Sequence, residues 1–360
     1  MPPMKGLLLA GGHGTRLRPL TFTGNKHMIP IANQPMLFYG LHHLADVGID
    51  EIGIILGPMH EGIQEAVGNG GSFGVRVTYI TQGEPKGLAH AVLCAREFLK
   101  DDDFVMYLGD NLLQQGAQPL VRRFRQGPVD AVVGVTPVPH PSSYGVVELD
   151  GDRIASIEEK PANPRSNLAL IGVYLFTASI HPIIEQLTPS RRGELEITDA
   201  IWRLFRSGKS VAVQPVEGWW KDTGKPEDLL EANEKVLRSL PVDHFALEGT
   251  VEPRAEIVGP VGLGPGSRVA AGSHVEGPTV IGAGVKIESG SRIGPGTAVG
   301  NRCTIRESSV TRSILLEGTE VQGRVDLVDS IVGRNAIIRS ADPRRVQISC
   351  IMGDATKLRL

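Results

Sequence analysis

Short apolar runs alternate with helical patterns over the first part of the chain. The runs are rich in Leu, Ile and Val and end at glycine or polar positions, which is typical of buried strands in a parallel sheet. Amphipathic patterns between them predict helices at Met36–Val47 and Gly87–Leu99. This order favours an α/β fold with a mostly parallel sheet. The predicted strands are Gly6–Ala10, Ile52–Leu56, Val75–Thr81, Phe104–Leu108 and Ala131–Val135.

The pattern changes between residues 144 and 176. Alternating positions predict an antiparallel hairpin of Gly145–Leu149 with Arg153–Ile157, followed by a strand at Ala169–Phe176. We expect these strands to form an inserted subdomain that covers one side of the sheet. The remaining predicted elements are helices at Ile180–Leu187, Ile197–Arg206 and Pro226–Leu240 and a strand at Val211–Val216.

A third pattern begins beyond Pro241. From Val251 to Ile305 an aliphatic residue occupies every sixth position, ten times in succession, and residues 249–300 contain 13 glycines. A hexapeptide period with recurrent turns is typical of a parallel β-helix, in which three repeats complete a coil. The spacing then slips, resuming at Leu315, and we expect the basic end, residues 344–360, to cap the last coil.

Aromatic residues support a division into two domains, 1–240 and 241–360. Sixteen of the 17 aromatics precede Pro241, and Phe245 is the one that follows it. A broad sheet-and-helix core has room for aromatic rings, whereas a narrow coil filled by one aliphatic residue per hexad has little. We expect the second domain to support assembly and not catalysis.

Composition narrows the classes of partner. With 37 basic and 40 acidic residues, the net charge of −3 gives no overall basic field for nucleic acid. No apolar run approaches the roughly 18 residues of a membrane span. The three cysteines, Cys94, Cys303 and Cys350, are far apart and predict neither a disulfide framework nor a zinc site. We therefore expect a cytoplasmic protein that recognises its ligands locally.

The first strand runs into a glycine-rich loop. Its glycines, Gly11, Gly12 and Gly14, let backbone N–H groups approach phosphate oxygens, and Arg16 with Arg18 can supply charge-assisted contacts. The loop lacks the Gly-Lys-Ser/Thr of a Walker loop, and Leu17 replaces the third glycine of a dinucleotide fingerprint. We interpret the loop as a phosphate site, with a plain tight turn as the alternative.

Two further polar segments follow predicted strands, where open α/β sheets bind ligands. Gln82 follows the third strand and can hydrogen-bond a pyrimidine edge, while Gly87 would let a base pack against the backbone. Asp110 follows the fourth strand. A carboxylate beside a phosphate loop is a natural Mg²⁺ ligand, although a turn or cap residue is the plainer alternative.

Together these segments resemble the sugar nucleotidyltransferase family, most closely its glucose-1-phosphate thymidylyltransferase branch in a long form. The resemblance covers about residues 4–240 and implies a Rossmann-like nucleotidyltransferase domain followed by a left-handed parallel β-helix. The matching motifs are Gly11–Leu17, Asn25–Pro30, Gln82 with Gly87-Leu88-Ala89, Leu108–Asn111, Tyr144–Val147, Glu158–Pro161, Gly172-Val173-Tyr174, Gly193–Asp199 and Trp219–Gly224. One departure is His27-Met28, where glutamine and leucine commonly follow the lysine.

The resemblance implies a reaction. A deoxythymidylyl group passes from dTTP to glucose 1-phosphate by direct attack of the sugar phosphate on the α-phosphorus, giving dTDP-glucose and pyrophosphate. The reaction would depend on Mg²⁺ and open dTDP-deoxysugar biosynthesis, as in antibiotic-type pathways. The flat faces of a β-helix commonly pack against symmetric copies, so we expect a homo-oligomer, either a tetramer or a trimer. Charge and hydropathy predict no nucleic-acid or membrane partner.

The resemblance also implies a role for each matching residue. Arg16 and Lys26 would hold the triphosphate and the leaving pyrophosphate, Asp110 and Asp222 the Mg²⁺, and Lys160 the sugar phosphate. The residues implied to face the glucose are Gly145, Glu159, Tyr174, Glu196 and Trp220, and those implied for the nucleotide are Leu9, Gly11, Gly12, Gly14, Thr15, Gln82 and Gly87.

Each role has a structural alternative. Glu158–Pro161 could be a solvated charge run, Tyr174 a core tyrosine, Trp219-Trp220 a packing pair and Asp222 a helix cap. Only the joint occurrence of the motifs favours the functional roles.

Rival functions are of three kinds. The nearest is another base or sugar, a UTP-dependent glucose enzyme or a GTP-dependent mannose enzyme. A second makes the β-helix an acyltransferase, for which His274 is the lone histidine among the ten hexads. The third is a non-catalytic regulatory subunit, against which the full set of charged residues argues.

Overall fold

The computed structural model describes residues 4–58, 60–151, 153–342 and 344–360. Contacts within the chain divide it into two compact units. One contains the chain up to His13 together with Leu37–Asp222, and the other contains Gly14–Met36 together with Thr223–Leu360. The segment with most of the predicted phosphate loop thus belongs to the same unit as the predicted β-helix.

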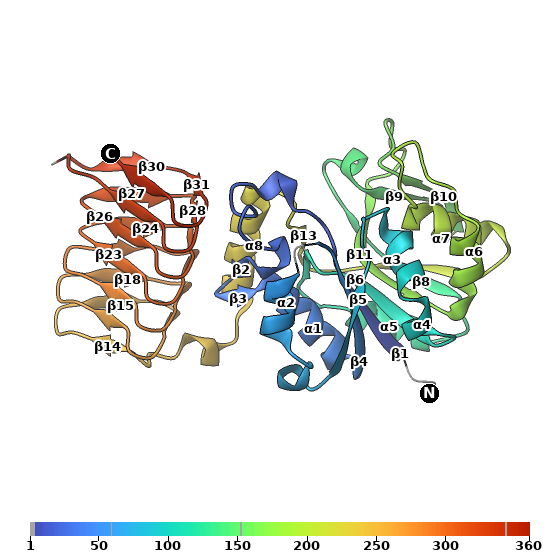
Figure 1. Ribbon diagram of the computed structural model, residues 1–360, viewed down its shortest axis with the longest axis horizontal. Helices are drawn as coiled ribbons and strands as arrows, with labels where there is room; N and C mark the ends of the chain where they lie inside the picture. Colours follow the sequence, from blue (N-terminus) through green and yellow to red (C-terminus); the bar gives the residue numbers. More distant parts are fainter. Residues whose placement is uncertain (1–3, 59, 152, 343) are drawn as a thin grey trace. The chain divides into compact units, whose positions relative to one another are not determined.

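The first unit is built on a nine-stranded mixed sheet, in which the path β10-β9-β11-β6-β1-β4-β5 is joined by hydrogen bonds (Figure 1). β8 pairs with β11, and β12 pairs with β8. Four neighbouring strands of this sheet run parallel to one another, as predicted. Most apolar side chains of β1, β4 and β6 are buried, so this part of the sheet is the expected parallel α/β core. The parallel strands are β1 (Met4–Ala10), β4 (Glu51–Leu56), β5 (Arg76–Thr81) and β6 (Asp103–Leu108).

The predicted inserted subdomain is wrong, because its strands extend the same sheet. β11 (Leu168–Phe176) pairs antiparallel with β8 along one edge and with β6 and β9 along the other. Its nine-residue run is buried from Ala169 onward, and buried backbone groups need partners along both edges. The other strands are β8 (Ala131–Pro137), β9 (Gly145–Asp150), β10 (Arg153–Glu159) and β12 (Val211–Pro215).

Two of the strands predicted as buried and parallel differ from expectation. β5 lies at the edge of the sheet and leaves Arg76, Thr78 and Thr81 exposed, because it has a neighbour on one side. β8 is buried but pairs antiparallel with β11, and parallel with β12 alone.

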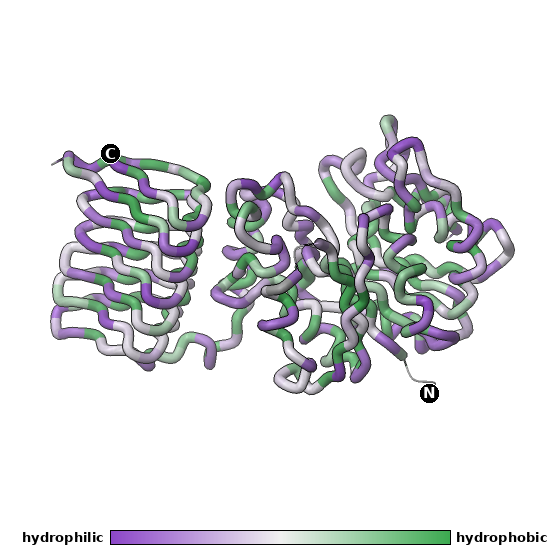
Figure 2. Tube along the Cα trace, in the orientation of Figure 1, coloured by the Kyte–Doolittle hydropathy of each residue, from purple (hydrophilic) through white to green (hydrophobic). Residues whose placement is uncertain are grey.

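Helices cover the sheet and leave a continuous apolar core. Phe104 of β6 and Phe176 of β11 pack with ring centroids 5.5 Å apart, and the central strands carry the hydrophobic colour in Figure 2. The predicted helix 87–99 is interrupted at Ala95. The helices of this unit are α1 (Met36–Asp46), α2 (Glu61–Val67), α3 (Leu88–Cys94), α4 (Arg96–Leu99), α5 (Gln118–Arg125), α6 (His181–Glu185) and α7 (Ile197–Arg206). In the described residues no helix has both the length and the apolar character needed to cross a membrane.

The second unit contains the predicted β-helix, formed by three parallel sheets. Its strands stack coil on coil in Figure 1, each paired with the equivalent strand of the next coil. One sheet contains β14 (Thr250–Val251), β17 (Arg268–Val269), β20 (Lys286–Ile287), β23 (Thr304–Arg306), β26 (Glu320–Gln322), β29 (Ile337–Arg339) and β32 (Lys357–Arg359). The second contains β15 (Glu256–Val258), β18 (His274–Glu276), β21 (Arg292–Ile293), β24 (Ser309–Thr311), β27 (Val325–Val328) and β30 (Val346–Ile348). The third contains β16 (Val261–Leu263), β19 (Thr279–Ile281), β22 (Thr297–Val299), β25 (Ile314–Leu315), β28 (Ile331–Val332) and β31 (Ile351–Met352).

The hexad aliphatics fill the coils. Ile305, Val310 and Leu315 are all fully buried although they are spaced by five residues, so the slip in the repeat shortens two corners without emptying the core. Those corners place Glu307 and Arg312 at positive φ, 48° and 45°. The basic end that was expected to cap the last coil supplies the final strand of each sheet, β30, β31 and β32.

Five short elements and one helix complete the second unit, and one of these elements is the 3₁₀ turn η6 (Val242–Phe245). The segment 14–36 forms two 3₁₀ turns, η1 (Thr15–Leu17) and η2 (Lys26–Met28), and a hairpin of β2 (Pro30–Ile31) with β3 (Gln34–Pro35). Helix α8 (Pro226–Ser239) precedes the first coil.

Candidate active site

The carboxyl ends of the central strands are tied together in the first unit. The Gly109 amide donates to the Leu9 carbonyl at 2.9 Å, and the Gln82 amide donates to the Leu56 carbonyl at 3.0 Å. A side chain at Gly11 would place its Cβ 2.8 Å from Gln82 Oε1. Leu9, Gly11 and Gln82 therefore lie close together at the carboxyl ends of the parallel strands, where the sequence predicts nucleotide binding.

A close backbone contact within this unit explains why residue 87 is a glycine. Its φ is 103°, and a Cβ there would lie 2.5 Å from the Leu195 carbonyl oxygen. Leu195 is held in place by two hydrogen bonds, from its amide to Lys86 O and from the Ala89 amide to its own carbonyl. Gln82 Nε2 donates to Gly87 O at 3.2 Å. The glycine thus joins the Gln82 loop to the loop that carries Glu196.

A two-stranded sheet brings the predicted metal ligands close in register. β7 (Asn111–Leu113) and β13 (Trp220–Asp222) run antiparallel, with Asp222 opposite Asn111. Asn111 is buried, donates to Asp110 Oδ1 at 3.0 Å and accepts from Trp220 Nε1 at 2.7 Å. Asn111 therefore links Asp110 to Trp220 through two hydrogen bonds. The sequence motif did not predict this role.

The structure does not use Asp222 as the cap of α8. Lys225 precedes the first turn of that helix, and its amide donates to Asp228 Oδ2 at 3.0 Å. The described residues contain no cluster of three or more His, Cys, Asp or Glu side chains that could hold a metal ion alone. Two carboxylates fit Mg²⁺, since that ion is commonly bound by one or two carboxylates and completes its shell with water and substrate phosphates.

A second polar group gathers around Arg192. Its Nη1 lies 3.2 Å from both Glu159 Oε1 and Glu196 Oε1, and its Nη2 lies 3.3 Å from Glu194 Oε1. Glu159 ends β10 and Glu196 immediately precedes α7, so one guanidinium joins the two carboxylates predicted to face glucose. Burial raises the pKa of the Glu196 carboxyl, and the nearby Glu159 charge raises it further.

Sequence reasoning missed Arg192. It adjoins the Gly193–Asp199 motif in the sequence, but nothing local distinguishes it from the exposed Arg191. Its importance comes from Glu159, 33 positions away.

Other predicted sugar contacts surround this group. Gly145 lies close to Thr198, since a Cβ at Gly145 would meet Thr198 Cγ2 at 2.6 Å and Glu159 Oε2 at 3.2 Å. Thr198 Oγ1 donates to Glu159 Oε2 at 3.3 Å. Lys160 is exposed at φ 44°, with Nζ 3.7 Å from Glu159 Oε1. The structure thus brings Gly145, Glu159, Lys160 and Glu196 together.

The two predicted aromatic contacts have clear packing roles. Tyr174 is 4% exposed and stacks with Phe176 at 6.1 Å, and burial raises its pKa. Trp220 meets Tyr144 edge to face at 5.3 Å. Both arrangements agree with the packing alternatives, and a contact with glucose stays a prediction.

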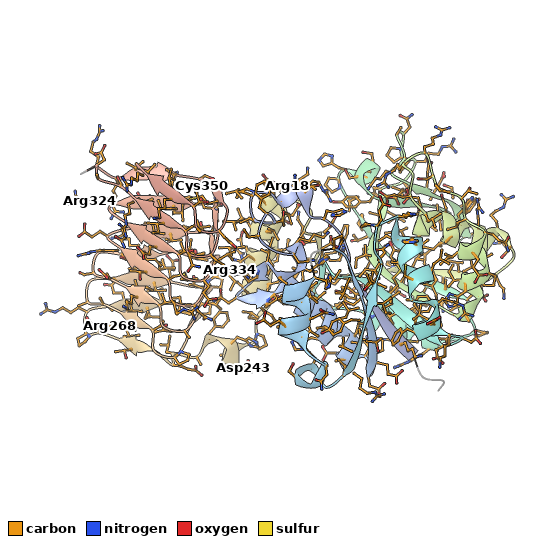
Figure 3. The ribbon with its side chains drawn as sticks, viewed as in Figure 1. Arg18, Asp243, Arg268, Arg324, Arg334 and Cys350 are labelled. Atoms are coloured by element: carbon orange, nitrogen blue, oxygen red, sulfur yellow. The ribbon has the colours of Figure 1, made fainter. Side chains whose placement is uncertain are left out.

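Of the remaining residues predicted to bind phosphate, Gly12 lies in the first unit, and Gly14, Thr15, Arg16 and Lys26 lie in the second. Gly14 has φ 63°, and a Cβ there would lie 3.0 Å from Lys26 Cβ. Thr21 Oγ1 donates to Gly14 O at 2.8 Å. Arg16 is exposed with Thr15 on η1, and a Cβ at Gly224 would lie 2.9 Å from its guanidinium. The unit therefore brings Gly14, Arg16 and Lys26 together, and Figure 3 labels Arg18 at the end of this loop.

The departure at His27 is structural. His27 is 2% exposed, and its Nδ1 lies 2.7 Å from Asn25 Oδ1. The same oxygen accepts from the His27 amide at 2.8 Å, which starts η2. Histidine therefore faces inward and leaves Lys26 as the partly exposed cation of the turn.

Comparison with known proteins agrees with both parts of the chain. Residues 5–239 match the family described as Nucleotidyl transferase, and residues 275–359 match the family described as GMPPB C-terminal domain. A glucose-1-phosphate thymidylyltransferase of Streptomyces antibioticus is 45% identical over 359 residues, 99% of each chain. The low-salt glycan biosynthesis nucleotidyltransferase Agl11 of Haloferax volcanii is 45% identical over 343 residues, 94% of this chain and 95% of the relative.

A solved structure shows the same catalytic fold. A Bacillus anthracis protein assigned as a glucose-1-phosphate thymidylyltransferase, in complex with sucrose, is 37% identical, covering 64% of this chain and 94% of its own, with a TM-score of 0.61. The α/β fold, the polar residues grouped within it and the family match over residues 5–239 all indicate the same family. The chain belongs to the nucleotidyl transferase family and is a nucleotidyltransferase enzyme with a C-terminal parallel β-helix.

Proposed function

We propose that the chain transfers a deoxythymidylyl group from dTTP to glucose 1-phosphate, giving dTDP-glucose and pyrophosphate. The observation that carries this proposal is the 45% identity over 99% of both chains to the Streptomyces antibioticus glucose-1-phosphate thymidylyltransferase. Similarity that spans the β-helix as well as the catalytic part favours the same substrates over a distant member of the family.

The reaction needs positioning and charge rather than a protein nucleophile. A phosphate oxygen of glucose 1-phosphate forms a bond to the α-phosphorus of dTTP, and the bond from that phosphorus to the oxygen bridging the α- and β-phosphates breaks. The electron pair leaves with pyrophosphate. Lys160 holds the attacking phosphate, and Arg16 and Lys26 neutralise the charge that develops on the leaving group.

Mg²⁺ would be held by Asp110 and Asp222, and when bound it lowers the negative charge on the phosphates between which the bond forms. Asn111 fixes one of these carboxylates through its hydrogen bond to Asp110. The pairing of β7 with β13 holds the second carboxylate residue, Asp222, opposite Asn111.

Sugar selection rests on the group around Arg192. Glu159 and Glu196 offer carboxylate oxygens that accept hydrogen bonds from sugar hydroxyls, and Arg192 orients both carboxylates. The Gly145 backbone lies beside them, where a larger side chain would meet Thr198 and Glu159. Gln82 selects the base through its amide.

The test is pyrophosphate release by the full chain across dTTP, UTP, GTP, ATP and CTP, each with glucose, mannose, galactose and N-acetylglucosamine 1-phosphates. The highest kcat/KM for dTTP with glucose 1-phosphate is expected. A preference for UTP with glucose or GTP with mannose would instead support those rivals, and no release with any pair would support the regulatory subunit.

Acetyl-CoA consumption, measured alongside, tests the acyltransferase rival. His274 Nδ1 lies 3.0 Å from Glu256 Oε2, and the two residues are register partners on the neighbouring strands β18 and β15. This contact with Glu256 gives the histidine a structural role, so we expect no consumption of acetyl-CoA.

Two further parts of the proposal concern context. The product would feed dTDP-deoxysugar biosynthesis, and the enzyme would act as a homo-oligomer, tetramer or trimer. Light scattering coupled to size exclusion measures the second directly.

A further inference from the structure

The hairpin that follows Lys26 is attached to the β-helix by an asparagine. The turn between β2 and β3 consists of Ala32 and Asn33, with φ 48° and 64°. Asn33 Nδ2 donates to Val299 O at 2.8 Å and lies 3.5 Å from Val280 O. These carbonyls belong to β22 and β19, neighbouring strands of one sheet, so a single side chain binds two successive coils.

A second asparagine connects the same turn to α8. Asn233 is fully buried; its Oδ1 accepts from the Ala32 amide at 2.8 Å and its Nδ2 donates to Gly296 O at 2.9 Å. Ala32 also packs against the apolar cluster of Leu237, Val280 and Ala298. Both ends of this amide are used, which joins the hairpin, the helix and the turn before β22.

The segment is attached on the other side of Lys26 as well. Thr23 Oγ1 donates to Asp354 Oδ2 at 2.7 Å, and Asp354 Oδ1 accepts from the Arg334 amide at 2.7 Å. Gly353 lies against Pro19, since a Cβ there would be 3.2 Å from Pro19 Cβ. Figure 3 labels Arg334 on the β-helix. Lys26 thus lies between two points of attachment to the coils.

We propose that Asn33 and Asn233 are positioning residues for the nucleotidyl transfer, because they hold the segment that carries Lys26 on the β-helix. The inference rests on the proposed function, which assigns the triphosphate to Arg16 and Lys26. The expectation that the second domain serves assembly alone is replaced by a role in the reaction: the coils fix the position of an ammonium group. A misplacement of about 1 Å can cost about 100-fold in rate.

The direct test is Asn33→Gly in the full chain. Glycine keeps the left-handed turn and removes the bonds to Val280 and Val299. We expect the KM for the nucleoside triphosphate to rise about tenfold, as for the loss of one well-placed hydrogen bond. The KM for the sugar 1-phosphate should change less than about twofold, and the melting temperature should stay within a few degrees. The affinity for inorganic tripolyphosphate with Mg²⁺ should fall by the same factor as the KM rises.

Asn335→Gly is the matched control. Asn335 also has a positive φ of 54° and lies exposed between β28 and β29. Its backbone N–H donates to Glu317 O, a bond that glycine would keep. The same substitution there should leave both KM values and the tripolyphosphate affinity unchanged. Asn33→Asp is a second variant at the site. It keeps the size of the side chain but presents a carboxylate to two carbonyl oxygens, so it should exceed the effect of Asn33→Gly.

Two outcomes would overturn the inference: unchanged triphosphate KM and tripolyphosphate affinity in both Asn33 variants, or equal losses for triphosphate and sugar phosphate together with a fall in melting temperature. Asn233→Leu is a third variant for the same measurements, because it removes both hydrogen bonds of the buried side-chain amide, to Ala32 and Gly296. Failure of the proposed function would look different, because the wild-type chain itself would turn over no dTTP with glucose 1-phosphate. The tripolyphosphate measurement does not depend on the base or the sugar.

Discussion

Asp222 lies directly opposite Asn111 in the pairing of β13 with β7, and Asn111 donates to the neighbouring Asp110. Two carboxylates separated by 112 positions in the sequence therefore adjoin Asn111: Asp110 precedes it in the chain, and Asp222 lies opposite it in this small sheet. This pairing is the structural basis of the proposed Mg²⁺ site.

Removing either carboxylate should abolish metal-dependent turnover. In Asp110→Asn and Asp222→Asn we expect kcat to fall at least about 100-fold, because an amide is a weak Mg²⁺ ligand. The melting temperature should stay within a few degrees, since the amide has nearly the same shape. Pyrophosphate release against Mg²⁺ concentration measures the effect. The exposed Asp150→Asn is the control, and normal turnover in either active-site variant would refute the metal assignment.

Arg192→Ala should weaken binding of the sugar phosphate selectively. Without the guanidinium, Glu159 and Glu196 lose their shared partner, so the KM for glucose 1-phosphate should rise about tenfold. The KM for dTTP should remain nearly constant. Steady-state kinetics with each substrate varied in turn measures the difference, and Arg191→Ala serves as the exposed neighbour. Equal changes in both KM values would show that Arg192 supports the fold and not the sugar site.

Gly87→Ala should destabilise the first unit far more than Gly83→Ala. Both glycines have positive φ, 103° and 64°, but a Cβ at Gly83 meets open space and one at Gly87 meets the Leu195 backbone. We expect costs of about 1 kcal/mol for Gly83→Ala and about 3 kcal/mol for Gly87→Ala. All three tryptophans lie between residues 202 and 220, so tryptophan fluorescence during urea unfolding follows this unit. Similar costs would mean that the Leu195 loop moves easily.

Acidification should destabilise the first unit through His43. Burial lowers the pKa of His43 to about 4, and its Nδ1 lies 3.0 Å from the Tyr107 hydroxyl. An unfolded histidine titrates near 6.5, so between these values the unfolded chain binds more protons and unfolding is favoured. The stabilisation is complete above about pH 6.5 and is lost progressively as the pH falls towards 4. At pH 5 the loss should be about 2 kcal/mol.

His43→Gln isolates this contribution. Its unfolding free energy should change less between pH 7 and pH 5 than that of the wild-type chain, by about 2 kcal/mol. The exposed His42→Gln should behave as the wild type does. An unchanged pH dependence in His43→Gln would assign the acid sensitivity to other groups.

The elements predicted correctly are those whose signal is local. β1 shows a continuous apolar run because both of its faces are buried, and the hexads from Val251 to Ile305 repeat because one residue of each fills the coil. β11 was recognised as a strand but misplaced, because its nine apolar residues do not say which strands lie beside it. Its position between β6 and β8 follows from long-range pairing.

The candidate site was predicted by residue type and not by geometry. Asp110 and Asp222 were named, but β7 and β13 have three residues each and carry no periodic signal. Arg192 was missed because its partner Glu159 comes from another strand. The attachment of Asn33 was missed for the same reason, since a turn asparagine reads as local turn chemistry.

The attachment of Asn33 and Asn233 to the coils has a consequence for exchanging parts between family members. Their acceptors on the β-helix, Val280 O, Gly296 O and Val299 O, are backbone carbonyls. A foreign β-helix could therefore differ in side chains at these positions and still receive the catalytic part, provided that its coils keep the same length. A single-residue deletion in the corner before β22 would shift Gly296 and its neighbours along the coil. In such a chimera the number of residues per corner, more than sequence identity, would decide whether the graft is active.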